Sequence, residues 1–148
     1  MFSYDRCRIW GKQMIRQFEE KDLEFIDVNE FSDIGIYRNL ILSDFMQKAT
    51  LVDGEKVLCV ICYMQYADYR YKAFFIMSKD FTAKYARELK KFVYFTAKEL
   101  KAKRVETESL DCELINRWHR FLGMTLEGKK TRFLDDETDF NLWSILWE

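Results

Sequence analysis

The sequence predicts one domain of the α/β (α+β) class, built on a mixed, mostly antiparallel central sheet. Three observations carry this prediction: an Asp-Gly dipeptide between two apolar runs, a long segment with apolar residues at helical spacing, and alternating strand and helix patterns in the last third. A chain of 148 residues is long enough to bury one core, and its 49% hydrophobic residues are ordinary for a folded protein.

Bulk composition limits the function classes. The formal net charge of −1 gives no global sign of nucleic-acid or membrane binding. No apolar run approaches the ~20 residues that span a bilayer, and the N-terminus has no apolar signal segment, so we expect a cytoplasmic protein. Aromatic residues make up 17% of the chain, which fits either a dense aromatic core or an interaction surface.

Four cysteines are spread along the chain, and only Cys59 and Cys62 are close in sequence. Both lie in a strand-like run, where residues three apart point to opposite faces. No second cysteine pair or nearby histidine completes a zinc site. We therefore expect buried free thiols and no metal.

The N-terminal third has the weakest patterns. Residues 8–10 suggest a first short strand, and 12–21 suggest a helix with an apolar face made of Met14, Ile15 and Phe18. Within 23–44, the apolar residues Phe25, Ile26, Val28 and Phe31 fit a second helix or a loop. A short extended piece is expected at 34–37, and one or two helical turns at 39–47.

The middle of the chain predicts an antiparallel meander. Residues 49–52 and 56–63 flank Asp53-Gly54, a dipeptide that supplies the positive φ angles of a tight hairpin turn. A third strand is expected at 71–77, after a turn at 66–70.

A helix is predicted over 83–101, with Ser78, Asp80 or Thr82 as its N-cap. Its apolar stripe consists of Tyr85, Leu89, Phe92, Val93, Thr96 and Leu100. Its polar side and the residues that follow are basic: Lys84, Arg87, Lys90, Lys91, Lys98, Lys101, Lys103 and Arg104. Such a face can follow a phosphate backbone, but the acidic residues elsewhere and the balanced net charge favour a solvated face over nucleic-acid binding.

The C-terminal third completes the sheet. We expect a strand at 104–108, a helix at 111–122, and strands at 124–128 and 140–146, the last of these preceded by an acidic turn at 135–139. Trp143 and Trp147 would share one face of the final strand. They would serve core packing or, if exposed, a homo-oligomer contact.

The run from Arg104 to Gly128, with a helix that stops at Gly123 and a following Glu127-Gly128, resembles the C-terminal half of the GNAT (N-acetyltransferase) fold. The order of elements over 48–148 is similar as well. The resemblance implies a single GNAT-like domain over 1–148, with six or seven strands and helices on both faces. Its ligand site would be an open V between the fourth and fifth strands, 71–77 and 104–108.

The resemblance also implies acetyl-CoA as cofactor and places its binding residues. In the family a loop of the form Q/R-x-x-G-x-G/A cradles the pyrophosphate, and the matching segment here, 77–86, has no glycine. Lys79 and Lys84 could supply charge instead, whereas Phe81 is bulky where the family is small. The implied contacts are Phe75, Ile76, Met77, Ser78, Lys79, Phe81, Thr82 and Lys84.

Acid and base residues follow from the same resemblance. The family's general acid is a Tyr four residues before the glycine that ends the helix, and counting back from Gly123 gives His119. A histidine can act near neutral pH, or it can simply pack beside Trp118. Glu106 and Glu108 share one strand face and are the candidate bases, unless they are solvated edge carboxylates.

Two functions follow as hypotheses. The first is an N-acyltransferase that moves an acyl group from an acyl-CoA to an unknown amine acceptor. The second is a catalytically inactive GNAT-like module that binds a protein partner or serves a structural role. Small GNAT-like proteins of tailed phages, including some packaged in the virion, are similar in length, composition and loop, which would place this chain in the host cytoplasm or the virion.

Overall fold

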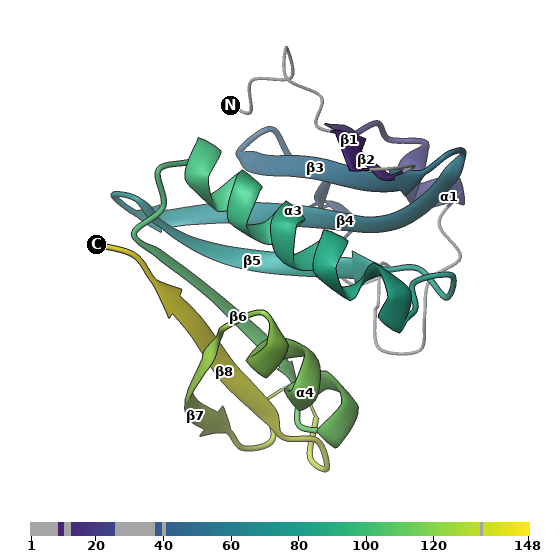
Figure 1. Cartoon of the computed structure of the whole chain (residues 1–148). Coiled ribbons are helices and arrows are strands. Elements are labelled where there is room, and N and C mark those ends of the chain that lie inside the picture. Colours follow the sequence, from purple (N-terminus) through teal and green to yellow (C-terminus); the bar gives the residue numbers. More distant parts are fainter. Residues whose placement is uncertain (1–8, 11–12, 26–37, 40, 134) are drawn as a thin grey trace.

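The computed structural model describes residues 9–10, 13–25, 38–39, 41–133 and 135–148 (Figure 1). The strands and helices are β1 (Ile9–Trp10), β2 (Gln13–Gln17), α1 (Asp22–Phe25), β3 (Met46–Asp53), β4 (Lys56–Ala67), β5 (Arg70–Met77), the 3-10 turn η2 (Ala83–Tyr85), α3 (Ala86–Glu99), β6 (Arg104–Leu110), α4 (Glu113–Phe121), β7 (Thr125–Lys130) and β8 (Phe140–Leu146). These strands form one sheet in the order β1-β2-β3-β4-β5-β6-β8-β7.

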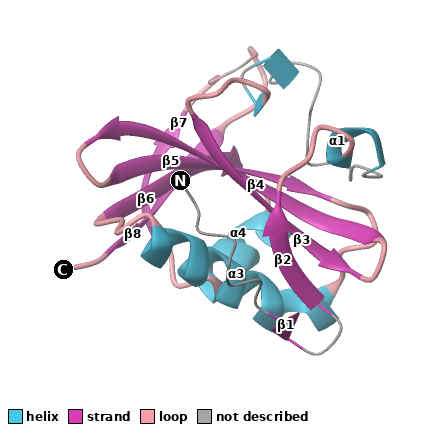
Figure 2. Cartoon of the chain, turned by 90° about the horizontal axis from the view of Figure 1, so that it is seen from above, coloured by secondary structure: helices cyan, strands magenta, loops and turns pink. Residues whose placement is uncertain are grey.

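The sheet confirms the predicted class, because β5–β6 is the one parallel pair among the described strands and every other pair is antiparallel. β1 has only two residues, so the strands of five residues or more match the expected six or seven. α3 and α4 lie against one face of the sheet and α1 lies against the other (Figure 2). The expected helices on both faces are therefore present.

The central hairpin forms where the sequence places it. Asp53 pairs with Lys56, so the two central turn residues are Gly54 and Glu55, one position later than predicted. Gly54 has a φ of +59°, the left-handed conformation that glycine adopts without a steric cost. β3 and β4 then pair from this turn to Met46 and Met64.

The predicted helix over 12–21 is wrong, because residues 13–17 form strand β2. Gln13 to Gln17 pair antiparallel with Asp53 to Ala49 of β3. Without β2, strand β3, whose residues 49–52 are buried, would leave one edge of backbone N–H and C=O groups without partners, which is costly. Ile15, which fits helical spacing with Phe18, instead points from strand β2 into the core.

Asp22 fixes the connection after β2. Its carboxylate is 1% exposed and receives two hydrogen bonds from the Arg16 guanidinium, at 2.9 and 2.6 Å, and one from the Thr50 hydroxyl at 2.8 Å. Burial alone would raise the pKa of Asp22, but these bonds and the Glu19 N–H lower it overall. The buried charge is therefore paired and ties β2, α1 and β3 together.

The remaining N-terminal predictions have mixed outcomes. Ile9–Trp10 is a strand, as expected within 8–10. At the start of the 23–44 segment the chain forms helix α1 (Asp22–Phe25). Residues 26–37, with the expected extended piece at 34–37, lie outside the described residues. The helical turns expected over 39–47 end early, because β3 begins at Met46.

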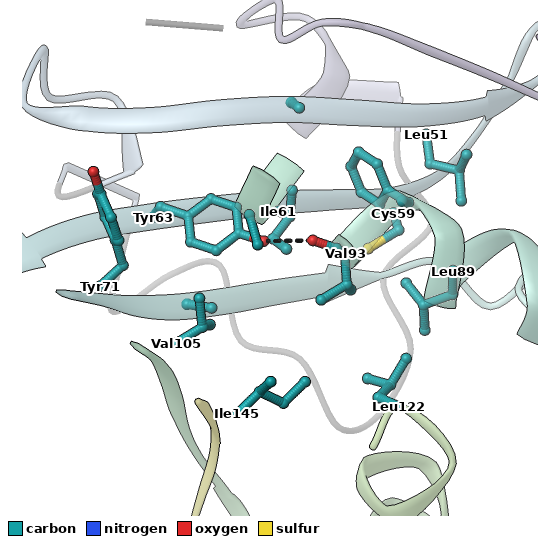
Figure 3. Packing of buried hydrophobic residues seen from close by; sticks show 14 of the residues in the cluster. Leu51, Cys59, Ile61, Tyr63, Tyr71, Leu89, Val93, Val105, Leu122 and Ile145 are labelled. Atoms are coloured by element: carbon teal, nitrogen blue, oxygen red, sulfur yellow. Dashed lines mark hydrogen bonds between the residues drawn. The ribbon is translucent and has the colours of Figure 1, made fainter. Parts of the chain in front are cut away.

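Two apolar clusters fill the two faces of the sheet. The larger lies between the sheet and α3 and includes Phe92, Val93 and Trp143, each at most 1% exposed. The hydroxyl of buried Tyr63 reaches across from β4 to α3, where it donates to the Val93 carbonyl at 3.5 Å (Figure 3). The same hydroxyl lies 2.7 Å from the Thr96 hydroxyl. The predicted apolar stripe of the 83–101 helix is buried here in full. The smaller cluster, on the opposite face, includes Leu23, Val60 and Ile76.

The cysteine prediction is confirmed for the pair in β4. Cys59 belongs to the larger cluster and Cys62 to the smaller, so their side chains lie on opposite faces, and both are free and fully buried. Burial raises the pKa of both thiols. Cys7 lies outside the described residues. No group of three or more His, Cys, Asp or Glu in the described part is arranged to hold a metal.

Tyr94 and Gly123 join α3 to the end of α4. Gly123 ends α4 with a φ of +84°, while the Met124 N–H bonds to the His119 carbonyl and the Gly123 N–H bonds to the Arg120 carbonyl. This is a Schellman cap. A Cβ on Gly123 would lie 2.7 Å from the Tyr94 hydroxyl oxygen, which donates to the Leu122 carbonyl at 3.1 Å.

None of the helices in the described residues combines the length and the apolar content that crossing a membrane requires.

Gly123→Ala should destabilise the fold by about 1–3 kcal/mol, because the new methyl group strains the left-handed backbone and displaces the Tyr94 hydroxyl. Urea denaturation followed by circular dichroism measures this. Gly128→Ala is the matched control, because open space surrounds that position, and it should stay within about 0.5 kcal/mol of wild type. Equal effects of the two substitutions would contradict the role given to Gly123.

Candidate functional site

β5 and β6 begin side by side and then part. Their parallel pairing covers only Arg70, Tyr71 and Lys72 against Arg104, Val105 and Glu106. Beyond this point β5 runs on to Met77 beside β4, while β6 pairs with β8 over seven residues. Figure 1 shows the two strands diverging, with α3 beside one and α4 beside the other. The predicted V between these strands is thus part of the architecture.

The inner edge of β5 offers backbone groups to this opening. The Ser78 N–H bonds to the Leu58 carbonyl on β4, and strand residues alternate, so the peptide groups of Ala73 and Phe75 point the other way, to the side that β6 has left. The side chains of Phe75 and Met77 pack against the larger cluster, whereas Ile76 is buried in the smaller one. Of the predicted strand contacts, Ile76 therefore points away from the α3 side.

The loop from Ser78 to Thr82 occupies the place expected for a phosphate cradle, but its N–H groups are largely in use. Asp80 donates its N–H to the Ser78 hydroxyl at 3.0 Å, and Phe81 donates its N–H to the Ser78 carbonyl at 3.1 Å. The Phe81 ring packs on Trp118 of α4, with 5.3 Å between ring centroids. An aromatic contact therefore bridges the loop and α4.

Carboxylates surround the first turn of the helix that follows. The Tyr85 hydroxyl donates to Asp53 at 2.7 Å, and this bond, burial and the charges of Asp53, Asp80 and Glu88 raise the pKa of Tyr85 to about 12. On the other side, the Lys84 ammonium lies 4.8 Å from the Tyr85 ring centroid. Negative charge at a helix N-terminus opposes the binding of a second anion there.

The residues present do not fit the diphosphate of acetyl-CoA. Glycine is absent from the loop, the N–H groups of Ser78, Asp80 and Phe81 are bonded within the protein, and carboxylates stand at the helix start. A diphosphate needs free N–H groups and a positive field at that point. Within the described residues, the parting strands are the feature that agrees with the acetyl-CoA expectation, and the loop does not agree with it.

The His119 side chain lies on the inner side of α4 and faces the sheet. It is 7% exposed, stacks on Trp143 of β8 with 5.3 Å between centroids, and its Nδ1 is 2.8 Å from the Ile115 carbonyl oxygen. Burial lowers its pKa, so the ring is neutral near pH 7. The side chain that reaches the 78–82 loop is instead Trp118, one position earlier on the helix.

Glu106 and Glu108 share one face of β6, as predicted, but both carboxylates are paired. Glu106 accepts hydrogen bonds from Arg104 at 2.9 and 2.8 Å, and Glu108 accepts from Lys72 at 3.0 Å and Lys130 at 2.6 Å. Val105 comes directly before Glu106 on the strand and packs into the larger cluster beneath α3. Because Glu106 is its neighbour on the strand and Glu108 is three residues away, both glutamates point to the opposite face of the sheet from His119. The structure therefore does not bring the three predicted catalytic residues together.

Asp111 holds the start of α4. Its Oδ1 accepts from the Asn116 and Asn141 amides, both at 3.0 Å, and its Oδ2 pairs with Lys129 at 2.8 Å. These bonds lower the pKa of Asp111 to about 2. One carboxylate thus joins α4, β7 and β8, and sets how α4 lies on the sheet.

Three apolar side chains on the outer side of α4 were missed by sequence reasoning. Leu114 and Phe121 are 51% and 42% exposed, and Trp118 lies between them. Their spacing of four and three residues is a helical stripe that the sequence does display. Asn116 and His119 of α4 face inward together with Leu122, which follows the helix, so two polar side chains are buried while the apolar Leu114 and Phe121 are exposed.

Comparison with known proteins identifies the fold. No family model and no curated protein matches the sequence. Solved structures do match, including a GNAT-family acetyltransferase from Bacillus anthracis (18% identity, TM-score 0.69, covering 99% of this chain and 98% of that one). A spermidine/spermine N-acetyltransferase from Vibrio cholerae (16%, 0.70, 92% and 93%) and a ribosomal-protein-S5-alanine acetyltransferase from Vibrio fischeri (12%, 0.70, 96% and 97%) are also similar. The chain therefore has the GNAT acetyltransferase fold.

The buried position of His119 predicts a pH-dependent stability. Because the folded state holds the ring with a pKa below its ordinary 6.5, the unfolded state binds more protons, and the free energy of unfolding should fall as the pH drops below 6.5. Urea midpoints at several pH values should show this loss in wild type and a smaller loss in His119→Gln. Identical pH profiles of the two proteins would contradict the buried neutral ring.

Proposed function

We propose that this chain uses the GNAT scaffold as a protein-binding module and does not carry out acetyl-CoA chemistry. The observation that carries the proposal is the Phe81–Trp118 contact, which closes the loop against α4 where the fold would admit a diphosphate. The engaged N–H groups of the loop support it, as do the carboxylates at the start of the helix. Beside the closed loop lies the exposed apolar stripe of α4.

A second candidate is acyl transfer from an acyl-CoA to an amine acceptor, and the parting of β5 from β6 favours it. The peptide groups of Ala73 and Phe75 on that edge suit the amides of a pantetheine arm. His119 is buried between α4 and the sheet, and Glu106 and Glu108 are paired on the opposite face of the sheet. Proton transfer would then require other groups.

The binding-module proposal extends to the setting of the protein. We infer a structural or host-interaction role like that of the small GNAT-like phage proteins that the chain resembles, in the virion or in the host cytoplasm. Such a role needs no donor site, and it is consistent with a loop that has lost its glycines.

Titration calorimetry with acetyl-CoA and with CoA tests the proposal. We expect no binding by wild type up to about 1 mM ligand, because the N–H groups of Ser78, Asp80 and Phe81 are bonded within the protein and carboxylates stand at the helix start. A variant with Asp80→Gly and Phe81→Gly removes one carboxylate and the aromatic contact together. It should gain measurable affinity if the loop is the obstruction.

Thermal melts of both proteins control for folding of the variant. Binding by wild type at micromolar concentrations, lost when 78–84 are altered, would sink the binding-module proposal and establish the acyl-CoA candidate. A screen of amine acceptors would then follow, with His119→Ala as a further variant.

A further inference from the structure

The surface next to the closed loop combines exposed apolar side chains with cations. We call it the α3–α4 face. Its residues are Phe81, Arg87, Lys90, Leu114, Arg117, Trp118, Arg120 and Phe121. Phe81 contacts Trp118, and the Lys90 ammonium lies 5.4 Å from the Phe121 ring centroid, so the two helices present one continuous surface. Cations outnumber carboxylates around these apolar groups, although exposed Glu113 pairs with Arg120 at 3.7 Å. Exposed apolar groups bordered mainly by charge of one sign indicate a binding surface.

The rings on this face are arranged for apolar contact with protein rather than for stacking on bases. Trp118 meets Phe81 and Phe121 edge to face, at 63° and 89° between ring planes, and Lys90 covers one side of Phe121. A nucleic-acid platform needs open ring faces on which bases stack. The cations at the rim therefore favour an acidic polypeptide with an apolar anchor.

The chain itself carries such a segment between β7 and β8. Asp135, Asp136, Glu137 and Asp139 follow Phe133, which is 39% exposed. We call Phe133 together with residues 135–139 the acidic loop. Beside it lies a surface hollow of about 260 Å³ lined by Leu110, Asp111, Glu137, Thr138 and Asp139. Asp111 is bonded to Asn116, Asn141 and Lys129, and Asp139 accepts the Arg132 N–H, so Glu137 is the carboxylate of this hollow that a guanidinium would meet.

Both surfaces carry charged side chains that form no ion pair within the described part of the chain. Within the described residues, neither Arg87 nor Arg117 forms an ion pair, and the same holds for the carboxylates of Asp136 and Glu137. In the same part of the chain, Arg104, Glu106, Glu108 and Lys72 do pair with neighbours. The unpaired charges are thus positive on the α3–α4 face and negative on the acidic loop.

We propose that the α3–α4 face binds the acidic loop of a second copy of this chain. This inference rests on the binding-module proposal and names its partner. Phe133 would meet the Leu114–Trp118–Phe121 stripe, and Arg87 and Arg117 would face Asp136 and Glu137. Because the two surfaces differ, the contact closes as a symmetric dimer when both copies exchange loops, and otherwise continues as a ring or chain.

Sedimentation velocity of the full chain tests this association. At protein concentrations from about 5 to 500 µM in low salt, wild type should show concentration-dependent assembly, reversed by about 0.5 M NaCl. Arg87→Glu with Arg117→Glu, or Asp136→Lys with Glu137→Lys, should each weaken assembly by at least about tenfold. An equal mixture of the two variants should assemble again, because the reversed charges complement one another.

Lys56→Glu, an exposed reversal on the β3–β4 turn, is the matched control and should assemble like wild type. A wild type that stays monomeric would overturn the inference, as would assembly that neither variant weakens or a variant mixture that stays monomeric. A monomer that binds a fluorescent oligonucleotide, and loses it with Arg87→Glu and Arg117→Glu, would also overturn it and assign the face to nucleic acid.

The same samples separate the two proposals when acetyl-CoA is added. Wild type that binds acetyl-CoA overturns the binding-module proposal whatever its assembly state. Monomeric wild type that binds no acetyl-CoA overturns only the choice of a second copy as partner.

Discussion

Three residue pairs between β5 and β6 determine the shape of this molecule. They are the only ladder that links the β1–β5 part of the sheet to the β6–β8–β7 part among the described strands. Beyond them each strand follows its antiparallel neighbour, and the two parts separate. Packing of Tyr94 on Trp147 and its bond to the Leu122 carbonyl then hold α3 to the C-terminal part from above. The opening between strands is thus a product of pairing, and side chains decide what it can accept.

Aromatic side chains gather around the 78–82 loop, where the fold could hold the diphosphate of an acyl-CoA. Phe81 of the loop contacts Trp118 of α4, and the Tyr85 hydroxyl donates its hydrogen bond to Asp53. Desolvation of a phosphate against rings and carboxylates is unfavourable, whereas an apolar protein anchor meets little penalty there. The same aromatic and acidic side chains therefore weaken the binding of a phosphate and favour contact with a protein, on an unchanged backbone fold.

The fold was predictable wherever local signals agreed. Asp53-Gly54, the 83–101 stripe and the final strand each carry their own pattern, and all three are present. Strand β2 was not predictable, because Ile15 and Phe18 fit helical spacing and only the open edge of β3 decides for a strand. The assignment of residues 1–148 to a single domain stays a prediction.

The candidate site was less predictable than the fold. Counting back from Gly123 selects His119, but adjacent helix residues point about 100° apart, so the rotation of α4 decides which side chain faces the loop. That rotation depends on Asp111 and Asn141, which bond Asn116 on the inner side of α4, and on Trp143, on which His119 stacks. Asn141 and Trp143 lie on β8, distant from α4 in sequence. Glu106 and Glu108 were placed on the correct shared face, but their pairing with Arg104, Lys72 and Lys130 depends on strand neighbours that the sequence does not reveal.

The bonds of Asp111 have a dynamic consequence. A single carboxylate connects the first turn of α4 to β8 through Asn141 and to β7 through Lys129. Local opening of any one of these three elements removes a partner from the other two. Their backbone amides should therefore exchange with solvent deuterium as one cooperative unit, separate from the meander of β3, β4 and β5.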